Sequence, residues 1–187
     1  MSHSLSCFRV LYVFLGCVGL ILSASGVGCE RATIPLEDSE DSTSDDDLKP
    51  DRLDRMETDL VLVRGHAFEV WLARTPAQLQ RGLMRVPAER MVPPPGVAGR
   101  GMLFIFPSER PLSFWMYNTI IPLDIAYIRG DGVIVSTYTM APLETQPYPS
   151  GEPALYALEV PAGLFEKLDI KPGDKVEIPQ SVLKSTP

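Results

Sequence analysis

The sequence predicts a mainly β domain, a compact barrel or sandwich of seven or eight short strands with one or two short helices. Three observations support this prediction. Apolar and polar residues alternate with a period of two in the strand-like runs. Turn-forming glycine, proline and aspartate interrupt the chain about every 8–12 residues, which is the usual spacing of short strands. Helix signals are confined to short stretches, so residues 59–180 are expected to form one β domain.

The first 28 residues are expected to be a leader rather than part of that domain. An uncharged apolar run at 10–22 follows Arg9 and precedes a series of small residues. This order is typical of a secretory leader, and a membrane-spanning helix would need about 20 apolar residues. Export to the cell envelope is therefore predicted, with an uncleaved membrane anchor as the alternative.

Two processing routes remain open at the end of the leader. The small residues at 23–25 suit ordinary signal cleavage, whereas Gly-Val-Gly-Cys at 26–29 resembles the lipobox of bacterial lipoproteins. In the second route Cys29 would carry the lipid. The other cysteines, Cys7 and Cys17, also lie in the leader, so the folded domain has no thiol for a disulfide, a nucleophile or a metal site.

Charge is unevenly distributed along the chain. Residues 30–57 contain eleven acidic and four basic residues, a net charge of −7, whereas residues 58–187 have a net charge of −1. The acidic, serine-rich composition predicts a disordered tether over residues 29–58. The domain itself is nearly neutral and has no basic cluster, which argues against nucleic acid as its partner.

The first elements expected in the domain are a β-hairpin and a short helix. The hairpin spans residues 60–73 with a turn at Arg64-Gly65, because Phe68 and its neighbours alternate with polar residues. Thr75 is suited to cap a helix over residues 77–84, with proline at the first helical position.

The middle of the domain should consist of short strands between proline-rich turns. Residues 86–99 contain three consecutive prolines and are expected to be a loop. Residues 101–106 are apolar on both faces of a strand, which indicates burial on both. Residues 107–111 should turn the chain, and residues 112–117 should return.

The last third should contain further short strands. Strands at 123–129 and 133–139 flank the turn Gly-Asp-Gly, and a loop with four prolines is expected over 141–153. The remaining expected elements are a strand, one or two helical turns, a final strand and a tail, at residues 154–160, 162–168, 176–178 and 181–187.

Five phrases carry a resemblance to a known family. They are GLM at 82–84, GMLFIF at 101–106, FWMYNT at 114–119, PLD at 122–124 and ALEVPAG at 157–163. Together they resemble the domain of unknown function 192 family, which occurs in bacteria and archaea and is often exported. The resemblance covers residues 63–178 and implies a compact β fold without a known activity. The chain departs from the family pattern at Arg85-Val86, where Arg usually stands second, and at Tyr117, where Lys is common.

Two acidic residues at apolar strand positions are candidate functional groups. Asp124 shares a strand face with Ala126 and Ile128, and Glu159 shares one with Leu155 and Ala157. A buried carboxylate is costly unless it is paired or hydrogen-bonded. Each residue could therefore bind a ligand or accept backbone N–H groups, and the pair could serve a glycan-cleaving enzyme if the two carboxyl groups lie close together.

Trp115, Asn118 and Thr119 are the second candidate group. A tryptophan can stack on a ligand and an asparagine can read its polar groups, which suits a carbohydrate or a peptide end. Alternatively, Asn118 and Thr119 only satisfy the backbone of a tight bend. Alternation leaves open whether Trp115 or the pair Phe114 and Met116 faces outward.

The methionines Met84, Met102 and Met116 are candidate copper ligands, because thioethers are soft ligands suited to Cu(I). Filling gaps in the core is their alternative role. His66 is the one histidine after the leader, and no GxSxG, GxxxxGK[ST] or GxGxxG motif occurs in the domain. Zinc sites, serine hydrolases and nucleotide enzymes are therefore disfavoured.

The leading hypothesis is an exported or lipid-anchored binding module rather than an enzyme, with no cofactor. Its pocket would be framed by Trp115, Asn118, Asp124 and Glu159, and it would receive a small polar ligand, a peptide end or an envelope component. A carboxylate enzyme acting on envelope glycans and a methionine-based copper protein are the alternatives.

Overall fold

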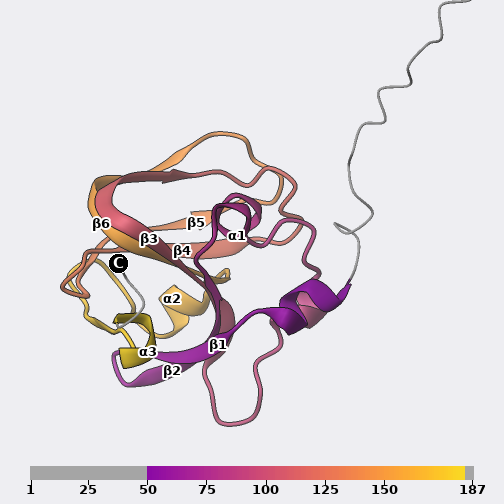
Figure 1. Cartoon of the computed structure of the whole chain (residues 1–187), viewed down its shortest axis with the longest axis horizontal. Coiled ribbons are helices and arrows are strands. Elements are labelled where there is room, and N and C mark those ends of the chain that lie inside the picture. The colour runs from indigo at the N-terminus through magenta and orange to yellow at the C-terminus, as the bar shows by residue number, and fades with distance from the viewer. Residues whose placement is uncertain (1–49, 184–187) are drawn as a thin grey trace, which may run out of the picture. The chain divides into compact units, whose positions relative to one another are not determined.

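The domain is built on one curled sheet of seven strands, as the computed structural model of residues 50–183 shows (Figure 1). The strand order is β5-β4-β6-β3-β2-β1-β7, and all neighbours are antiparallel except β2 and β3, which run parallel. The prediction of a mainly β fold is thus confirmed. The strands are β1 (Thr58–Val63), β2 (His66–Ala73), β3 (Gly99–Phe114), β4 (Leu123–Ile128), β5 (Ile134–Met140), β6 (Tyr148–Pro161) and β7 (Val176–Glu177).

The helices of the described residues are all short. The predicted cap is confirmed, because the Thr75 side chain accepts a hydrogen bond from the backbone N–H of Gln78. The helix ends at Arg81 rather than at residue 84, since Gly82 has a φ of 48° that side chains rarely adopt. The helical elements are η2 (Pro50–Arg55), α1 (Pro76–Arg81), η3 (Ala88–Met91), α2 (Leu164–Lys167) and α3 (Gln180–Leu183).

The two edges of the sheet approach each other and curl it into a half-barrel. Val133, just before β5, forms an isolated bridge with Lys175, just before β7. The backbone N–H of Ile134 donates to the carbonyl of Asp174 at 2.9 Å. These bonds satisfy backbone groups at both sheet edges, which reduces the exposed edge that could pair with another chain.

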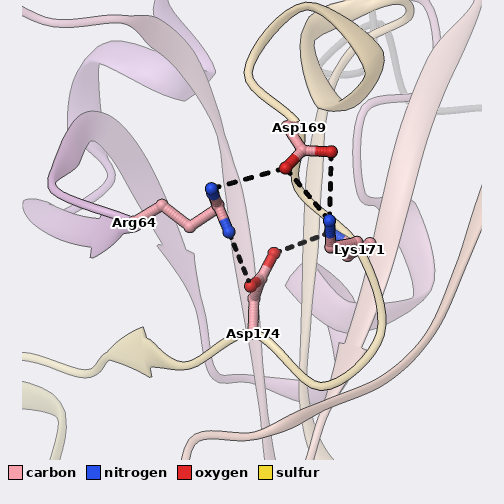
Figure 2. Close-up of polar contacts among 4 residues, drawn as sticks. All are labelled: Arg64, Asp169, Lys171 and Asp174. Atoms are coloured by element: carbon pink, nitrogen blue, oxygen red, sulfur yellow. Dashed lines mark hydrogen bonds and ion pairs between the residues drawn. The ribbon is translucent and has the colours of Figure 1, made fainter.

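A polar cluster lies on the surface beside this closure (Figure 2). Arg64, in the turn between β1 and β2, forms ion pairs with Asp169 at 3.4 Å and Asp174 at 3.2 Å. Lys171 pairs with Asp169 at 3.0 Å, and its backbone N–H donates to Asp174 at 2.9 Å. The four residues satisfy one another, so the cluster links the hairpin turn to the segment between α2 and β7.

The two faces of the sheet pack into two separate apolar clusters. All six residues of β4 are buried, and they alternate between the faces. Ala126 and Ile128 lie in the first cluster with the side chains of Leu158 and Val160, whereas Ile125 and Tyr127 lie in the second. We call these the inner cluster and the outer cluster. Elements α1 and η2 lie at the outer one.

The structure contradicts two predicted connections. Residues 107–111 do not turn the chain, and the predicted loop at 141–153 contributes its second half to a strand. Instead, β3 and β6 continue past the sheet as a long two-stranded arm, with Arg110 opposite Ala154 and Phe114 opposite Tyr148. Proline is tolerated there because Pro111 faces Pro153 where the register shifts.

The end of the predicted tether, residues 50–58, is folded against the domain. Leu53 in η2 is only 5% exposed and packs in the outer cluster. The backbone carbonyl of Glu57 accepts the N–H of Leu72 at 2.9 Å. Likewise, the predicted tail begins inside α3, where Val182 is buried.

The leader, the candidate lipidation residue Cys29 and the tether up to residue 49 lie outside the described residues. Within residues 50–183, none of the helices has the length and apolarity needed to cross a membrane.

Candidate functional site

A cleft of about 810 Å³ opens on the outer side of the sheet. Its walls come from η2, α1 and the segment that follows β3, and Met102 of β3 also lines it. Arg52, Arg55 and Arg81 line it, as do Trp115 and Tyr117. This volume is typical of pockets for small molecules, which hold about 300–1,000 Å³.

An exposed aromatic pair forms one side of the cleft. The ring centroids of Trp115 and Tyr117 lie 5.3 Å apart with the planes tilted by 33°, and the two residues are 53% and 48% exposed. Phe114 and Met116 point the other way, into the outer cluster. The alternative that the sequence left open is therefore decided, with Trp115 facing outward.

Arg52 is a partly buried cation in the cleft wall. Its Nη2 donates to the carbonyl of Gly82 at 3.1 Å, and burial lowers the pKa of its guanidinium. Within residues 50–183 no carboxylate forms an ion pair with Arg52. Because desolvation of a charge is costly without a counter-charge, this position favours an anion.

Sequence reasoning missed the three cleft arginines. Arg52 and Arg55 had been assigned to the tether, and Arg81 was considered only as part of a helix. One signal was present: Arg52 and Arg55 are three residues apart, a spacing that places side chains on one face of a 3₁₀ helix.

Glu159 lies beneath the cleft, on the outer face of β6. It is 4% exposed and sits opposite Met102 of β3 and Ile125 of β4. Its Oε2 would be 4.0 Å from a Cβ at Gly82, which is itself a lining residue. Within the described residues the carboxyl group has no hydrogen-bond partner, and burial raises its pKa to about 8.

Asp124 has a different environment. It is buried, accepts a hydrogen bond from Thr139 Oγ1 at 2.7 Å and accepts the backbone N–H of Phe165 at 3.0 Å. The sequence had left open whether Asp124 binds a ligand or accepts backbone N–H groups, and the backbone donor found here comes from α2. Both carboxylate oxygens have a partner, so Asp124 fastens α2 and β5 to β4.

Asp124 and Glu159 face opposite sides of the sheet. In the β4–β6 ladder, Asp124 pairs with Val160 of the inner cluster, and Ile125 of the outer cluster pairs with Glu159. Since successive residues of a strand alternate between faces, the two carboxyl groups cannot act on one bond. This geometry contradicts the hypothesis of a two-carboxylate glycan-cleaving enzyme for this pair.

Asn118 and Thr119 organise the turn after β3 and do not line the cleft. Asn118 has a φ of 57°, which asparagine tolerates, and its carbonyl accepts the backbone N–H of Arg85 at 2.8 Å. Thr119 is buried, and its carbonyl accepts the N–H of Leu143 at 2.9 Å. Their backbone hydrogen bonds hold the turn that carries Trp115 and Tyr117.

The candidate copper ligands are not brought together as a set. Met84 and Met102 line the cleft together with Met56, whereas Met116 is fully buried in the outer cluster. Three arginines line the same cleft as Met84 and Met102. Among residues 50–183, His, Cys, Asp and Glu form no group of three that could hold a metal ion.

The domain matches a family model over residues 60–178, that of DUF192, described as "Uncharacterized ACR". The chain belongs to this family. The resemblance of the five sequence phrases is thereby confirmed. No curated protein shows significant similarity to the chain.

Two crystal structures of bacterial proteins resemble this DUF192 member. The first, from Sinorhizobium meliloti 1021, is described as a "putative transcription regulator" and is 34% identical, with a TM-score of 0.59, over 65% of this chain and 94% of that one. The second is a protein of unknown function from Novosphingobium aromaticivorans DSM 12444. It is 36% identical, with a TM-score of 0.58, over 66% of this chain and 86% of that one.

Proposed function

We propose that this DUF192 domain is a binding module whose cleft receives a small ligand or the end of a peptide. The observation that carries the proposal is the state of the polar groups at the cleft. A partly buried arginine without a counter-charge and a buried carboxyl group without a hydrogen-bond partner meet at Gly82, among the residues 50–183. Buried polar groups are normally satisfied, so a ligand group is the simplest partner for the carboxyl group, while Arg52, which already donates to the Gly82 carbonyl, adds a positive charge beside it.

The positions of the family phrases support the same cleft. Gly82 and Met84 come from GLM, Met102 comes from GMLFIF, and Trp115 comes from FWMYNT. Glu159, beneath the lining, comes from ALEVPAG. Four of the five phrases therefore meet at one place, although they are far apart in sequence.

The description of the Sinorhizobium meliloti protein raises the alternative of DNA binding. The net charge of −1 over residues 58–187 argues against it, because non-specific affinity for DNA depends on contacts from cations to many phosphates. The cleft arginines line one recess, which suits a small anion better than a duplex. We therefore favour a small-ligand module over a DNA-binding one.

We further propose that the module works in the cell envelope, exported by the leader and held there by a lipid on Cys29 or by an uncleaved anchor. A detergent-partition assay of the full chain and the Cys29→Ser variant tests this. Lipidation predicts that the wild-type protein enters the detergent phase and the variant the aqueous phase. Equal partitioning of both would exclude the lipid.

Native mass spectrometry of the full chain, purified gently from its own host, tests the binding function. A retained mass is expected on the wild-type protein and on Arg64→Gln, a surface control outside the cleft. The mass should be lost from Trp115→Ala, which removes the exposed ring without opening the core. A retained mass that survives Trp115→Ala and Arg81→Gln would place the ligand elsewhere.

A further inference from the structure

Two loops on the surface of the domain carry large exposed apolar side chains. The loops are residues 115–122, between β3 and β4, and residues 141–147, between β5 and β6. Two backbone hydrogen bonds hold them side by side, because the N–H of Met116 donates to Glu144 at 2.8 Å and the N–H of Leu143 donates to Thr119 at 2.9 Å. The exposed apolar side chains of these loops, here called the loop patch, are Trp115, Tyr117, Ile120 and Leu143.

Leu143 has a backbone conformation that leucine rarely adopts. Its φ is 62°, in the left-handed region, which asparagine and glycine enter readily and larger side chains do not. The residue is also 59% exposed, so packing within the domain does not compensate for the strain. Strained backbone of this kind is concentrated at functional sites. A contact outside the domain therefore explains an apolar side chain at position 143 better than folding does.

The residue types of the loop patch match the interface of a lipid bilayer. Tryptophan and tyrosine are enriched at the level of the headgroups, because their rings are apolar and carry one polar atom. Isoleucine and leucine suit the acyl-chain boundary below the headgroups. The two loops contain one charged residue, Glu144, and its carboxylate accepts a hydrogen bond from the Tyr148 hydroxyl. The loop patch is thus apolar and nearly free of charge.

The chain that precedes the described residues joins the domain beside the loop patch. Helix η2 begins at Pro50, and η2 lines the same cleft as Trp115 and Tyr117. The stretch from Cys29, the lipid attachment point proposed above, to Pro50 spans at most about 75 Å even when fully extended. A membrane held at this distance has a high effective concentration, so a small patch of weak intrinsic affinity is sufficient for docking.

We propose that the loop patch docks on the surface of the phospholipid bilayer to which the chain is anchored. Trp115 and Tyr117 lie among the headgroups, and Ile120 and Leu143 enter the acyl-chain boundary. The aromatic side of the cleft then faces the membrane surface. This inference goes beyond the proposed binding function and rests on the envelope anchor proposed above.

Quenching of Trp115 by brominated lipid tests the docking. The full chain, purified from its own host, is reconstituted into phosphatidylcholine vesicles with or without bromine on the acyl chains near the headgroups. The emission of Trp115 is the difference between the wild type and Trp115→Phe, since Trp71 is only 4% exposed and contributes equally to both. It should fall by about half in brominated vesicles, because interfacial side chains lie about 5–10 Å into this boundary.

Variants outside the cleft separate docking from ligand binding. Leu143→Asn and Ile120→Ser together should restore most of the Trp115 emission, because they remove the side chains that enter the acyl-chain boundary. Leu143→Asn should keep or raise the thermal midpoint, since asparagine tolerates the φ at this position. It should also keep the ligand in native mass spectrometry, because Leu143 does not line the cleft.

Leu60→Asn is the matched control. Leu60 is 46% exposed and lies on β1, two strands away from β3 in the sheet. Its substitution removes the same side chain from a surface outside the loop patch. The quenching of Trp115 should therefore remain that of the wild type.

Three results would overturn the docking. Unquenched Trp115 in vesicles that carry the protein, or quenching that survives both loop variants, would exclude entry of the loop patch into lipid and leave the anchor and the cleft proposals standing. Unquenched Trp115 together with a dimer that Leu143→Asn dissociates would assign the loop patch to a second copy of the chain. Protein that does not associate with vesicles at all would contradict both the docking and the anchor.

Discussion

The two buried carboxyl groups of the sheet, Asp124 and Glu159, lie on neighbouring strands yet have opposite surroundings. Asp124 faces the inner cluster and accepts hydrogen bonds on both oxygens, from Thr139 and from the backbone of Phe165. Glu159 faces the outer cluster, beneath the cleft, and has no hydrogen-bond partner among residues 50–183. A satisfied buried acid stabilises the fold, whereas an unsatisfied one persists because something else requires it. The difference separates a structural residue from a candidate functional one.

The pH dependence of stability should show the largest effect of this difference. Below about pH 4.5, Glu159 is protonated in both the folded and the unfolded chain, so it contributes no pH dependence. Between pH 4.5 and about 8 the unfolded chain releases the proton and the folded domain keeps it. The free energy of unfolding should therefore fall by about 1.4 kcal/mol per pH unit as the pH rises.

Above pH 8 the folded domain also ionises and the decline stops, after a total of about 5 kcal/mol. Glu159→Gln should remove this pH-dependent decline in the free energy of unfolding. Urea unfolding of the wild-type protein and of the variant from pH 5 to 9 measures it. Burial, and to a lesser extent the charge of Glu159, raises the pKa of Tyr127 above its ordinary value, so Tyr127 stays neutral in this window. Parallel pH profiles for the two proteins would show that Glu159 is not desolvated.

Removal of the satisfied acid should have the next largest effect. Asp124→Ala leaves the Thr139 hydroxyl and the Phe165 N–H without their acceptor in a buried setting, at a cost of about 2–5 kcal/mol in the free energy of unfolding. Urea denaturation at pH 7 measures it. Asp124→Asn keeps one acceptor oxygen and should cost less. If Asp124→Ala instead lost ligand binding and kept its stability, Asp124 would be a functional residue rather than a structural one.

Gly82 separates the cleft from Glu159, and its substitution should have an intermediate effect. A Cβ at this position would lie 3.0 Å from the Phe104 ring, and the φ of 48° strains any side chain. Gly82→Ala should therefore destabilise the domain by about 1–3 kcal/mol. It should also weaken ligand retention in native mass spectrometry, since it narrows the approach to the carboxyl group. If Gly82→Ala retained the ligand as well as the wild-type protein does, Glu159 would lie outside the ligand site.

The surface cluster of Figure 2 should show the smallest effect. Arg64, Asp169 and Lys171 are largely exposed, and exposed ion pairs are weakened by solvent and salt. Arg64→Gln should change the thermal midpoint by no more than the measurement uncertainty, both at low salt and in sodium chloride at about 1 M. A clear salt-dependent loss would instead make the cluster a necessary clamp between the hairpin turn and the β7 segment.

Much of the fold could be predicted because its signals are local. The hairpin turn at Arg64-Gly65 and the Thr75 cap depend on residues within a few positions, and both occur as predicted. The arm formed by β3 and β6 could not be predicted in this way. Pro111 and Pro153 read locally as turn residues, and only their pairing across more than 40 positions shows that they lie opposite each other at a register shift.

For the candidate site, too, only the features with a local signal could be predicted. From sequence alone, Trp115 could be identified as a candidate ligand contact, Glu159 as an acid at an apolar position and the family from five phrases. The opposite facing of Asp124 and Glu159 depends on the register of β4 with β6, and the position of Arg52 depends on η2 packing through Leu53. The sequence by itself determined which groups are chemically unusual, because composition and local spacing suffice for that. The tertiary structure alone decided which of them share a cleft, because contacts between distant segments depend on strand register and packing.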